Sequence, residues 1–359
     1  MENTTLLSHK ELLQVDRDYE RSATAAHLLY VNDSQPGISR LKKGKGYCYR
    51  LADKTVRDKS ELQRIRSLAI PPSWTNVWIC ASANGHIQAT GLDLRGRKQY
   101  RYHTLWNTFR NETKFHRLYE FGKELPRLRE KMEADLRGRE LSREKVLATV
   151  LSLMEKTYIR VGNNEYEKTN GSYGLTTMKN KHVSITGDKL LFSFTGKKGV
   201  HHDITIRNRR LARAVGQCRD LPGKELFQYY DEEGNRHGID SGMVNQYIKD
   251  AVNMDFSAKD FRTWAGTLHA LQAFRSIGEA CDSTECKKNV TKVLQLVSHE
   301  LGNTRTVCKK YYVHPGLIQL YEDNKLVGYF KEDAAMDDAA MEDAAELVLM
   351  KILRRLTAL

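Results

Sequence analysis

The chain has 359 residues, of which 40% are hydrophobic, enough for one large domain or two ordinary ones with buried cores. Its net charge is +13, but residues 331–359 hold seven acidic against four basic side chains, which leaves +16 on residues 1–330. A body this basic favours a polyanionic partner such as nucleic acid. No apolar stretch approaches the roughly 18 residues of a membrane span. The first residues also lack the features of a signal peptide, so we expect a cytoplasmic protein that binds no membrane.

Cysteine usage and motif content indicate neither disulfides nor cofactors. The six cysteines are scattered through a chain too long to need disulfide staples, so reduced thiols are expected. Cys281 and Cys286 lie five residues apart with no matching second pair, which argues against zinc. A phosphate-binding loop, a dinucleotide fingerprint and a His-Glu-x-x-His motif are all missing from the sequence. We therefore expect neither a nucleotide nor a metal as cofactor.

Residues 1–104 are predicted to form a small β-rich domain with short helices. Strand composition occurs at 47–50 and 77–81, and the pair Pro71-Pro72 interrupts the chain between them. A basic and aromatic ribbon at 88–102 follows. Its candidate DNA contacts are Arg97, Lys98, Tyr100, Arg101 and Tyr102. An exposed hairpin broken by glycine, with no ligand, explains the same residues equally well.

From residue 105 to 359 the pattern becomes mainly helical around a small three-stranded sheet. Apolar residues at helical spacing follow Ser142, and Ser257 with Asp260 resembles a capping box. The strands are expected at 182–186, 189–195 and 200–206, and further helices at 208–219, 241–252, 257–277 and 284–300. Gly196-Lys197-Lys198-Gly199 is expected as a tight turn with two lysines at its tip. From about 331, an acidic amphipathic helix is predicted.

Candidate chemical groups lie at the edges of these elements. Near the carboxyl end, two adjacent tyrosines stand among lysines and are followed by Val313-His314-Pro315. A neutral phenol is a poor nucleophile, but cations around a phosphate make its attack on phosphorus feasible. Arg262 lies near the start of a predicted helix, where its charge opposes the helix dipole and hints at a binding role. Each group alone has an ordinary structural explanation. His201 and His202 point to opposite faces of a strand, so we expect packing and surface roles rather than a metal site.

Five separated blocks in order resemble type IB DNA topoisomerases of the small poxvirus and bacterial kind. The blocks are Arg160-Val161-Gly162-Asn163-Asn164-Glu165-Tyr166, Asn170-Gly171-Ser172-Tyr173-Gly174-Leu175-Thr176-Thr177, Gly196-Lys197, Lys259-Asp260-Phe261-Arg262-Thr263-Trp264, and Gly302-Asn303-Thr304 leading to Lys310-Tyr311-Tyr312-Val313-His314-Pro315. The resemblance runs from about residue 25 to 325. It implies an α+β fold, with a β-rich DNA-clamp domain at 1–104 and a catalytic domain of the tyrosine recombinase and topoisomerase IB type at 105–359.

The resemblance also implies site residues. Arg160 and Arg262 match the two catalytic arginines, Lys197 the hairpin lysine, and Lys259 an auxiliary proton donor. Asn303 stands where poxvirus enzymes have histidine, as in the bacterial branch, and Tyr312 aligns with the nucleophile. Tyr311 is its neighbouring alternative. Tyr166 and Lys198 join the candidate DNA contacts. The implied partner is double-stranded DNA, bound by a monomer located in the cytoplasm, on the nucleoid if bacterial or in the virion if viral.

The implied activity is relaxation of positive and negative supercoils through a 3′-phosphotyrosyl intermediate, without ATP or metal. A tyrosine recombinase is the nearest alternative, although recombinases typically show His-x-x-Arg where this chain has Lys259-Asp260-Phe261-Arg262. A DNA-binding protein without chemistry is the other alternative. The acidic tail has two readings: it packs on the catalytic domain, or it competes with DNA for the basic surface.

Overall fold

The computed structural model describes residues 18–44, 46–330 and 338–357, and the chain divides into two compact units, 1–117 and 118–359. The expected boundary at 104/105 is where the 34-residue helix α4 (Thr104–Arg137) begins, whereas the units divide within this helix. Both units mix helices with sheets, so the α+β prediction is confirmed. None of the described helices is long and apolar enough to cross a membrane.

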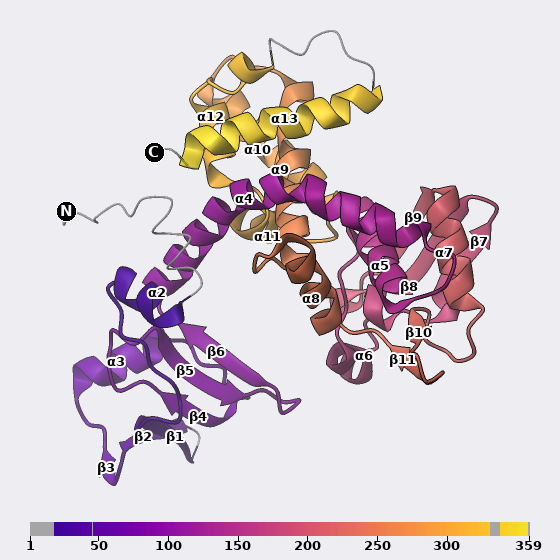
Figure 1. The fold of residues 1–359 in the computed structure, drawn as a ribbon. Helices are drawn as coiled ribbons and strands as arrows, with labels where there is room; N and C mark the ends of the chain where they lie inside the picture. The colour runs from indigo at the N-terminus through magenta and orange to yellow at the C-terminus, as the bar shows by residue number, and fades with distance from the viewer. Residues whose placement is uncertain (1–17, 45, 331–337, 358–359) are drawn as a thin grey trace. The chain divides into compact units, whose positions relative to one another are not determined.

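The first unit is built on an antiparallel six-stranded sheet with the order β3-β2-β1-β4-β5-β6 (Figure 1). Its elements are α2 (Tyr19–Ala25), β1 (Ile38–Lys43), β2 (Gly46–Leu51), β3 (Lys54–Thr55), α3 (Lys59–Ser67), β4 (Thr75–Ile79), β5 (Ile87–Leu92) and β6 (Lys98–Tyr102). Ile65 of α3 packs with Ile38, Val77, Ile79 and Ala89 of the sheet in a small buried core.

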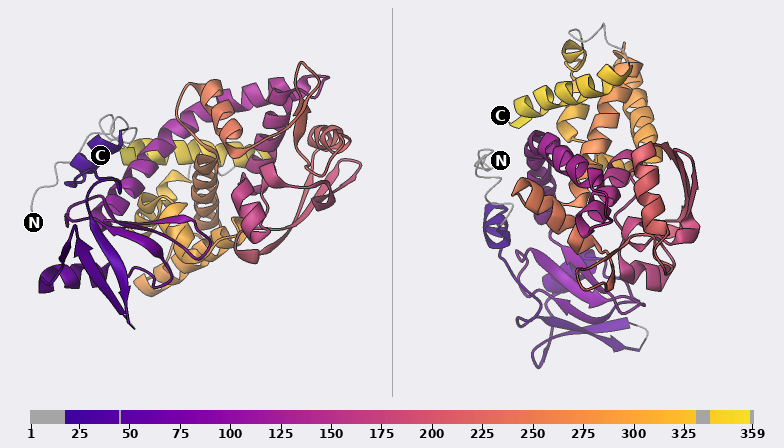
Figure 2. Two further views of the ribbon diagram at one scale, coloured as in Figure 1. Left: turned by 90° about the horizontal axis from the view of Figure 1, so that it is seen from below. Right: turned by 45° about the vertical axis from the view of Figure 1, so that its right-hand side comes forward.

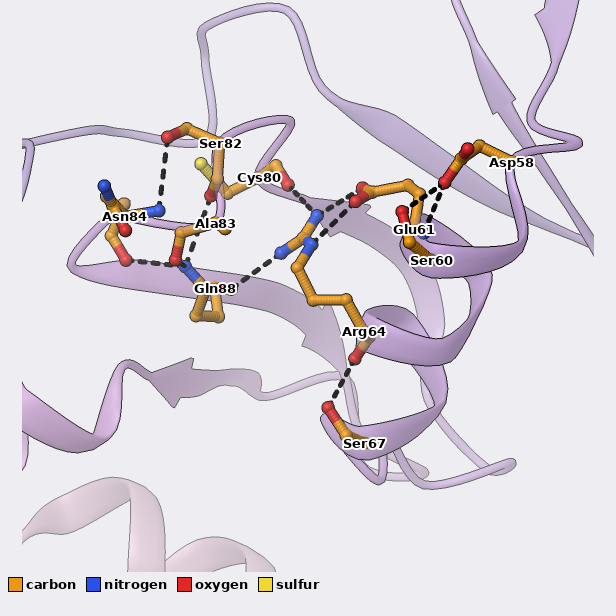
Figure 3. Close-up of polar contacts among 11 residues, drawn as sticks. Asp58, Ser60, Glu61, Arg64, Ser67, Cys80, Ser82, Ala83, Asn84 and Gln88 are labelled. Atoms are coloured by element: carbon orange, nitrogen blue, oxygen red, sulfur yellow. Dashed lines mark hydrogen bonds and ion pairs between the residues drawn. The ribbon is translucent and has the colours of Figure 1, made fainter.

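A single arginine ties α3 to the sheet (Figure 3). Arg64 donates to both oxygens of Glu61, to the Cys80 carbonyl at 2.7 Å and to Gln88 Oε1 at 2.7 Å. Gln88 is 2% exposed and its amide donates to three backbone carbonyls of the 82–85 loop. Because these buried polar groups are hydrogen-bonded, the network holds α3 and the loop without an unpaired charge.

The second unit is mainly helical. After α4 come α5 (Arg143–Thr157), α6 (Asn164–Asn170), β7 (Val183–Thr186), β8 (Lys189–Thr195), β9 (His201–Arg207), α7 (Arg209–Arg219), β10 (Gln228–Tyr230), β11 (Arg236–Gly238), α8 (Ser241–Val252), α9 (Ala258–Ile277), α10 (Ser283–Glu300), α11 (Arg305–Tyr311), α12 (Pro315–Glu322) and α13 (Asp338–Thr357). The sheet β7-β8-β9 and the four predicted helices between 208 and 300 lie within a residue or two of their expected bounds. The β10-β11 hairpin had no counterpart in the prediction.

Local signals explain these bounds. Ser142 caps α5 by accepting from the Lys145 amide at 3.2 Å. Ser257 and Asp260 form the predicted capping box at the start of α9. Helix α5 is buried along nearly its whole length and forms the centre of the large core of this unit.

Helix α13, drawn in yellow in Figure 2, packs against α9 within the second unit. Its apolar side includes the fully buried Leu349, Ile352 and Leu353. Glu346 accepts two hydrogen bonds from Arg129 of α4, at 2.8 and 2.9 Å, and one from the Trp264 indole at 3.2 Å. The prediction of a helical tail is thus confirmed for 338–357, and of the two readings of the tail, packing is the one observed; residues 331–337 lie outside the described residues.

Candidate active site

Arg160 is placed by the end of α5. The helix stops at Tyr158, which adopts a left-handed conformation with φ 55°, and the chain then turns into an extended stretch. The Arg160 carbonyl accepts from the Leu175 amide at 2.9 Å, and the Val161 carbonyl from the Thr176 amide at 2.7 Å. The first two blocks of the sequence therefore lie side by side in space.

Their close approach requires glycine. A Cβ on Gly174 would lie 2.5 Å from the Gly162 Cα and 2.6 Å from the Arg160 carbonyl oxygen. Gly162 itself has φ 103°, a conformation that side chains disfavour. These two glycines let the backbone that carries Arg160 pack directly on the Gly174–Thr177 segment.

The carboxyl end of α10 holds both candidate arginines. Arg160 Nη2 donates to the Gly302 carbonyl at 3.0 Å and to Asn303 Oδ1 at 2.6 Å. Arg262 Nη2 donates to the Leu301 carbonyl at 2.7 Å, and its Nη1 donates to the Tyr158 carbonyl. The last carbonyls of a helix carry partial negative charge, so this end stabilises two guanidinium groups side by side. The dipole of α9 disfavours the Arg262 charge, but the carboxyl end of α10 stabilises it.

Burial and charge set the electrostatics of the pair. Arg262 is 5% exposed and Arg160 is half-buried. Burial and the neighbouring Arg262 charge lower the pKa of Arg160 to about 10, which keeps it charged at neutral pH. Among the residues that the structure describes, nothing accepts from the buried Nε of Arg262. A buried N–H without an acceptor is costly, so this donor is one that a ligand could satisfy.

Tyr312 lies against this pair. Its ring centroid is 5.3 Å from Arg262 Cζ, within cation–π distance. Its backbone is fixed by the Cys308 carbonyl, which accepts from the Tyr312 amide at 2.9 Å, and by the Thr267 hydroxyl, which donates to the Tyr312 carbonyl at 3.1 Å. A Cβ on Gly266 would come within 2.7 Å of that carbonyl oxygen, so α9 needs glycine there.

Tyr311 has different surroundings. It is the last residue of α11, and the Lys310 ammonium lies 5.3 Å from its ring centroid. The Tyr312 ring, by comparison, lies beside the buried Arg262 guanidinium. The role of Tyr312 as the nucleophile stays a prediction.

The lysines lie at the rim. Lys197 and Lys198 occupy the exposed 3-10 turn at the tip of the β8–β9 hairpin, where Lys198 has φ 65°. The turn is closed by the Gly196 amide, which donates to the Val200 carbonyl at 2.7 Å. Lys259 is exposed in the first turn of α9, one turn before Arg262. Their catalytic roles stay predictions.

The candidate DNA contacts of the first unit lie on β6 or, for Arg97, directly before it. Lys98, Tyr100 and Tyr102 share its exposed face, and the two tyrosine rings stack with centroids 5.8 Å apart. Lys98 pairs with Asp33 at 2.6 Å, and Arg97 pairs with Asp93 at 2.7 Å.

Arg101 points to the other face of the strand. It donates to the Ala69 carbonyl at 2.9 Å and lies 5.9 Å from the Trp74 ring centroid. The strand alternation therefore separates this arginine from the tyrosines beside it. In the second unit, Tyr166 lies in α6, and its side chain is outside the described part of the structure.

Sequence reasoning gave no site role to three residues that lie around the site: Gly266, Thr267 and His202, of which His202 was expected only in packing or at the surface. Gly266 and Thr267 position Tyr312, and His202 contacts the Gly302 turn. A glycine inside a long predicted helix was the available signal for Gly266, because such a residue usually marks a close backbone approach. His202 had no local signal, since a strand histidine carries no mark of its distant neighbours.

Comparison with known proteins gives consistent matches. Residues 103–335 match the family described as eukaryotic DNA topoisomerase I, catalytic core, and residues 46–93 match the bacterial DNA topoisomerase IB N-terminal domain. DNA topoisomerase 1B of Acanthamoeba polyphaga mimivirus is 34% identical over 298 residues, covering 80% of this chain and 88% of the viral protein. DNA topoisomerase I of Monkeypox virus is 24% identical over 242 residues, covering 66% and 73%.

Among solved structures, a crystal structure of XerH site-specific recombinase bound to its difH substrate aligns with a TM-score of 0.33 and 13% identity. The alignment covers 62% of this chain and 52% of the recombinase. A likeness this distant carries no weight beside the family matches.

Proposed function

The chain belongs to the type IB DNA topoisomerase family, and on that premise we propose that it relaxes positive and negative supercoils through Tyr312. The observation that carries the assignment of the nucleophile is the Tyr312 ring lying 5.3 Å from the buried Arg262 guanidinium. Duplex DNA is the substrate, and the protein acts as a monomer.

The cleavage step is an in-line exchange at one backbone phosphate. The Tyr312 oxygen gives its proton to solvent water and forms a bond to phosphorus, while the bond from phosphorus to the 5′ oxygen breaks. The products are a 3′-phosphotyrosyl link and a strand that ends in a 5′-hydroxyl. The number of phosphoester bonds does not change, so the energy of the broken bond is kept in the new one.

Arg160 and Arg262 stabilise the charge that builds on the phosphoryl oxygens. Guanidinium groups stay charged and grip two oxygens at once, and the Arg262 Nε–H is one donor available for this purpose. Asn303 adds a neutral donor. Its amide has two hydrogens, and the bond to the Leu301 carbonyl at 3.2 Å uses one of them.

The leaving 5′ oxygen takes a proton, because an alkoxide is a poor leaving group. Lys197 at the hairpin tip is the proposed general acid, with Lys259 as an auxiliary donor. The 5′-hydroxyl then attacks the phosphotyrosyl link and reverses the step. Between the two steps the cut strand swivels, which requires no ATP, and arginine and lysine charges take the part that a metal ion plays elsewhere.

The test is relaxation of positively and negatively supercoiled plasmid in EDTA without ATP. Wild type and Tyr311→Phe are expected to relax both, while Tyr312→Phe relaxes neither and forms no covalent adduct. Relaxation by Tyr312→Phe would move the nucleophile to Tyr311. Inactive wild type, or recombined rather than relaxed products, would refute the proposal.

A further inference from the structure

The imidazole of His202 lies between two glycines that belong to different parts of the site. A Cβ on Gly196 would be 2.7 Å from the His202 Nε2, and a Cβ on Gly302 would be 2.8 Å from its Cε1. Both distances are too short for a real side chain, so the ring is seated against bare backbone on both sides. His202 also pairs with Phe194 across the hairpin, with ring centroids 5.2 Å apart at 26°.

Each glycine directly precedes, in the sequence, a residue of the proposed mechanism. Gly196 precedes Lys197, and its amide closes the hairpin tip. Gly302 precedes Asn303, and its carbonyl accepts from Arg160 at 3.0 Å. One side chain therefore bridges the base of the lysine hairpin and the turn that holds the arginine pair.

The ring is suited to this place because it stays neutral. Burial lowers the pKa of His202, and the nearby positive charges of Arg160, Arg262 and His201 lower it further. A lysine or arginine there would add a third cation beside the two guanidinium groups. A neutral, flat and half-buried ring fills the space between the glycines without that repulsion.

We propose that His202 is a positioning residue, whose ring sets the hairpin against the Gly302–Asn303 turn and so places Lys197 over the leaving oxygen. The inference rests on the proposed function, in which Lys197 is the general acid. The competing explanation is that His202 only packs on Phe194 and stabilises the sheet. The two explanations make different predictions about which step is slowed. If His202 acts by positioning Lys197, its loss slows only the transfer of a proton to the leaving group.

The test compares His202→Ala with His201→Ala, which removes the neighbouring exposed ring on the opposite strand face. Single-turnover formation of the covalent adduct is measured on two duplexes, one normal and one with sulfur replacing the bridging 5′ oxygen. A thiolate leaves without a proton, so the sulfur duplex bypasses the general acid. Lys197→Ala and wild type provide the two reference patterns, and melting temperatures report folding.

For His202→Ala we expect a rate about 100-fold below wild type on the oxygen duplex and within about threefold of it on the sulfur duplex. His201→Ala should match wild type on both. Equal slowing of His202→Ala on both duplexes, or no slowing on the oxygen duplex, would overturn the positioning role. If wild type itself formed no adduct on either duplex, the proposed function would fail, which is a separate outcome.

Discussion

Arg262→Lys is the sharpest test of how the site is built. The Arg262 guanidinium donates to the Tyr158 carbonyl and, at 2.7 Å, to the Leu301 carbonyl. Its Nε–H has no acceptor among the described residues. An ammonium keeps the charge, but its donors on a flexible stem do not form a planar fork. The variant therefore keeps the charge but loses the Nε–H, which the proposed mechanism assigns to the phosphate.

Loss of one preorganised donor to a developing oxyanion costs about 10²–10³ in rate, or about 2.7–4 kcal/mol. We expect Arg262→Lys to slow covalent adduct formation by that factor in single-turnover assays, with duplex affinity changed only a few-fold. Arg275→Lys, in the last turn of the same helix, is the control and should cleave normally. A rate for Arg262→Lys within tenfold of wild type would refute the idea that fork geometry, rather than charge alone, is required.

Three further predictions concern packing, stability and affinity. Gly266→Ala should displace Tyr312 and lower adduct formation at least tenfold, whereas Gly216→Ala, whose Cβ has open space, should not; equal rates for both would contradict the close contact. Glu346→Gln should lower the melting temperature by a few degrees, since it weakens a partly buried charge pair with Arg129. Burial raises the pKa of Glu346, but hydrogen bonds from Arg129 outweigh this and lower it below its usual value. The ion pair therefore stabilises the fold fully above the unfolded pKa of about 4.3, and this stabilisation is lost as pH falls through the lower folded pKa. The difference in melting temperature between wild type and Glu346→Gln should accordingly shrink in acid. A difference that stays constant with pH would count against the ion pair. Duplex affinity should fall linearly on a log–log plot against salt, and a flat plot would argue against phosphate contacts.

Local features of the sequence determined much of the second unit. Ser257 and Asp260 mark the start of α9 because the capping box involves residues three apart. The β8–β9 hairpin follows from a short glycine-bounded turn between two strand patterns. Each of these signals is contained within a few neighbouring residues, so a single sequence reveals it. The spaced motif blocks also indicated the candidate residues, because their order is specific to one family.

Tertiary structure alone decided how those residues meet. Arg160 and Gly302 are 142 positions apart, yet they share a hydrogen bond at the end of α10. Arg129 and Glu346 are 217 positions apart, and their pairing shows that the acidic tail helix packs on the second unit. His202 carries no local sign of its place between two glycines. Propensities and caps act over one helical turn, whereas these contacts depend on how whole elements pack, and only the folded chain establishes that packing.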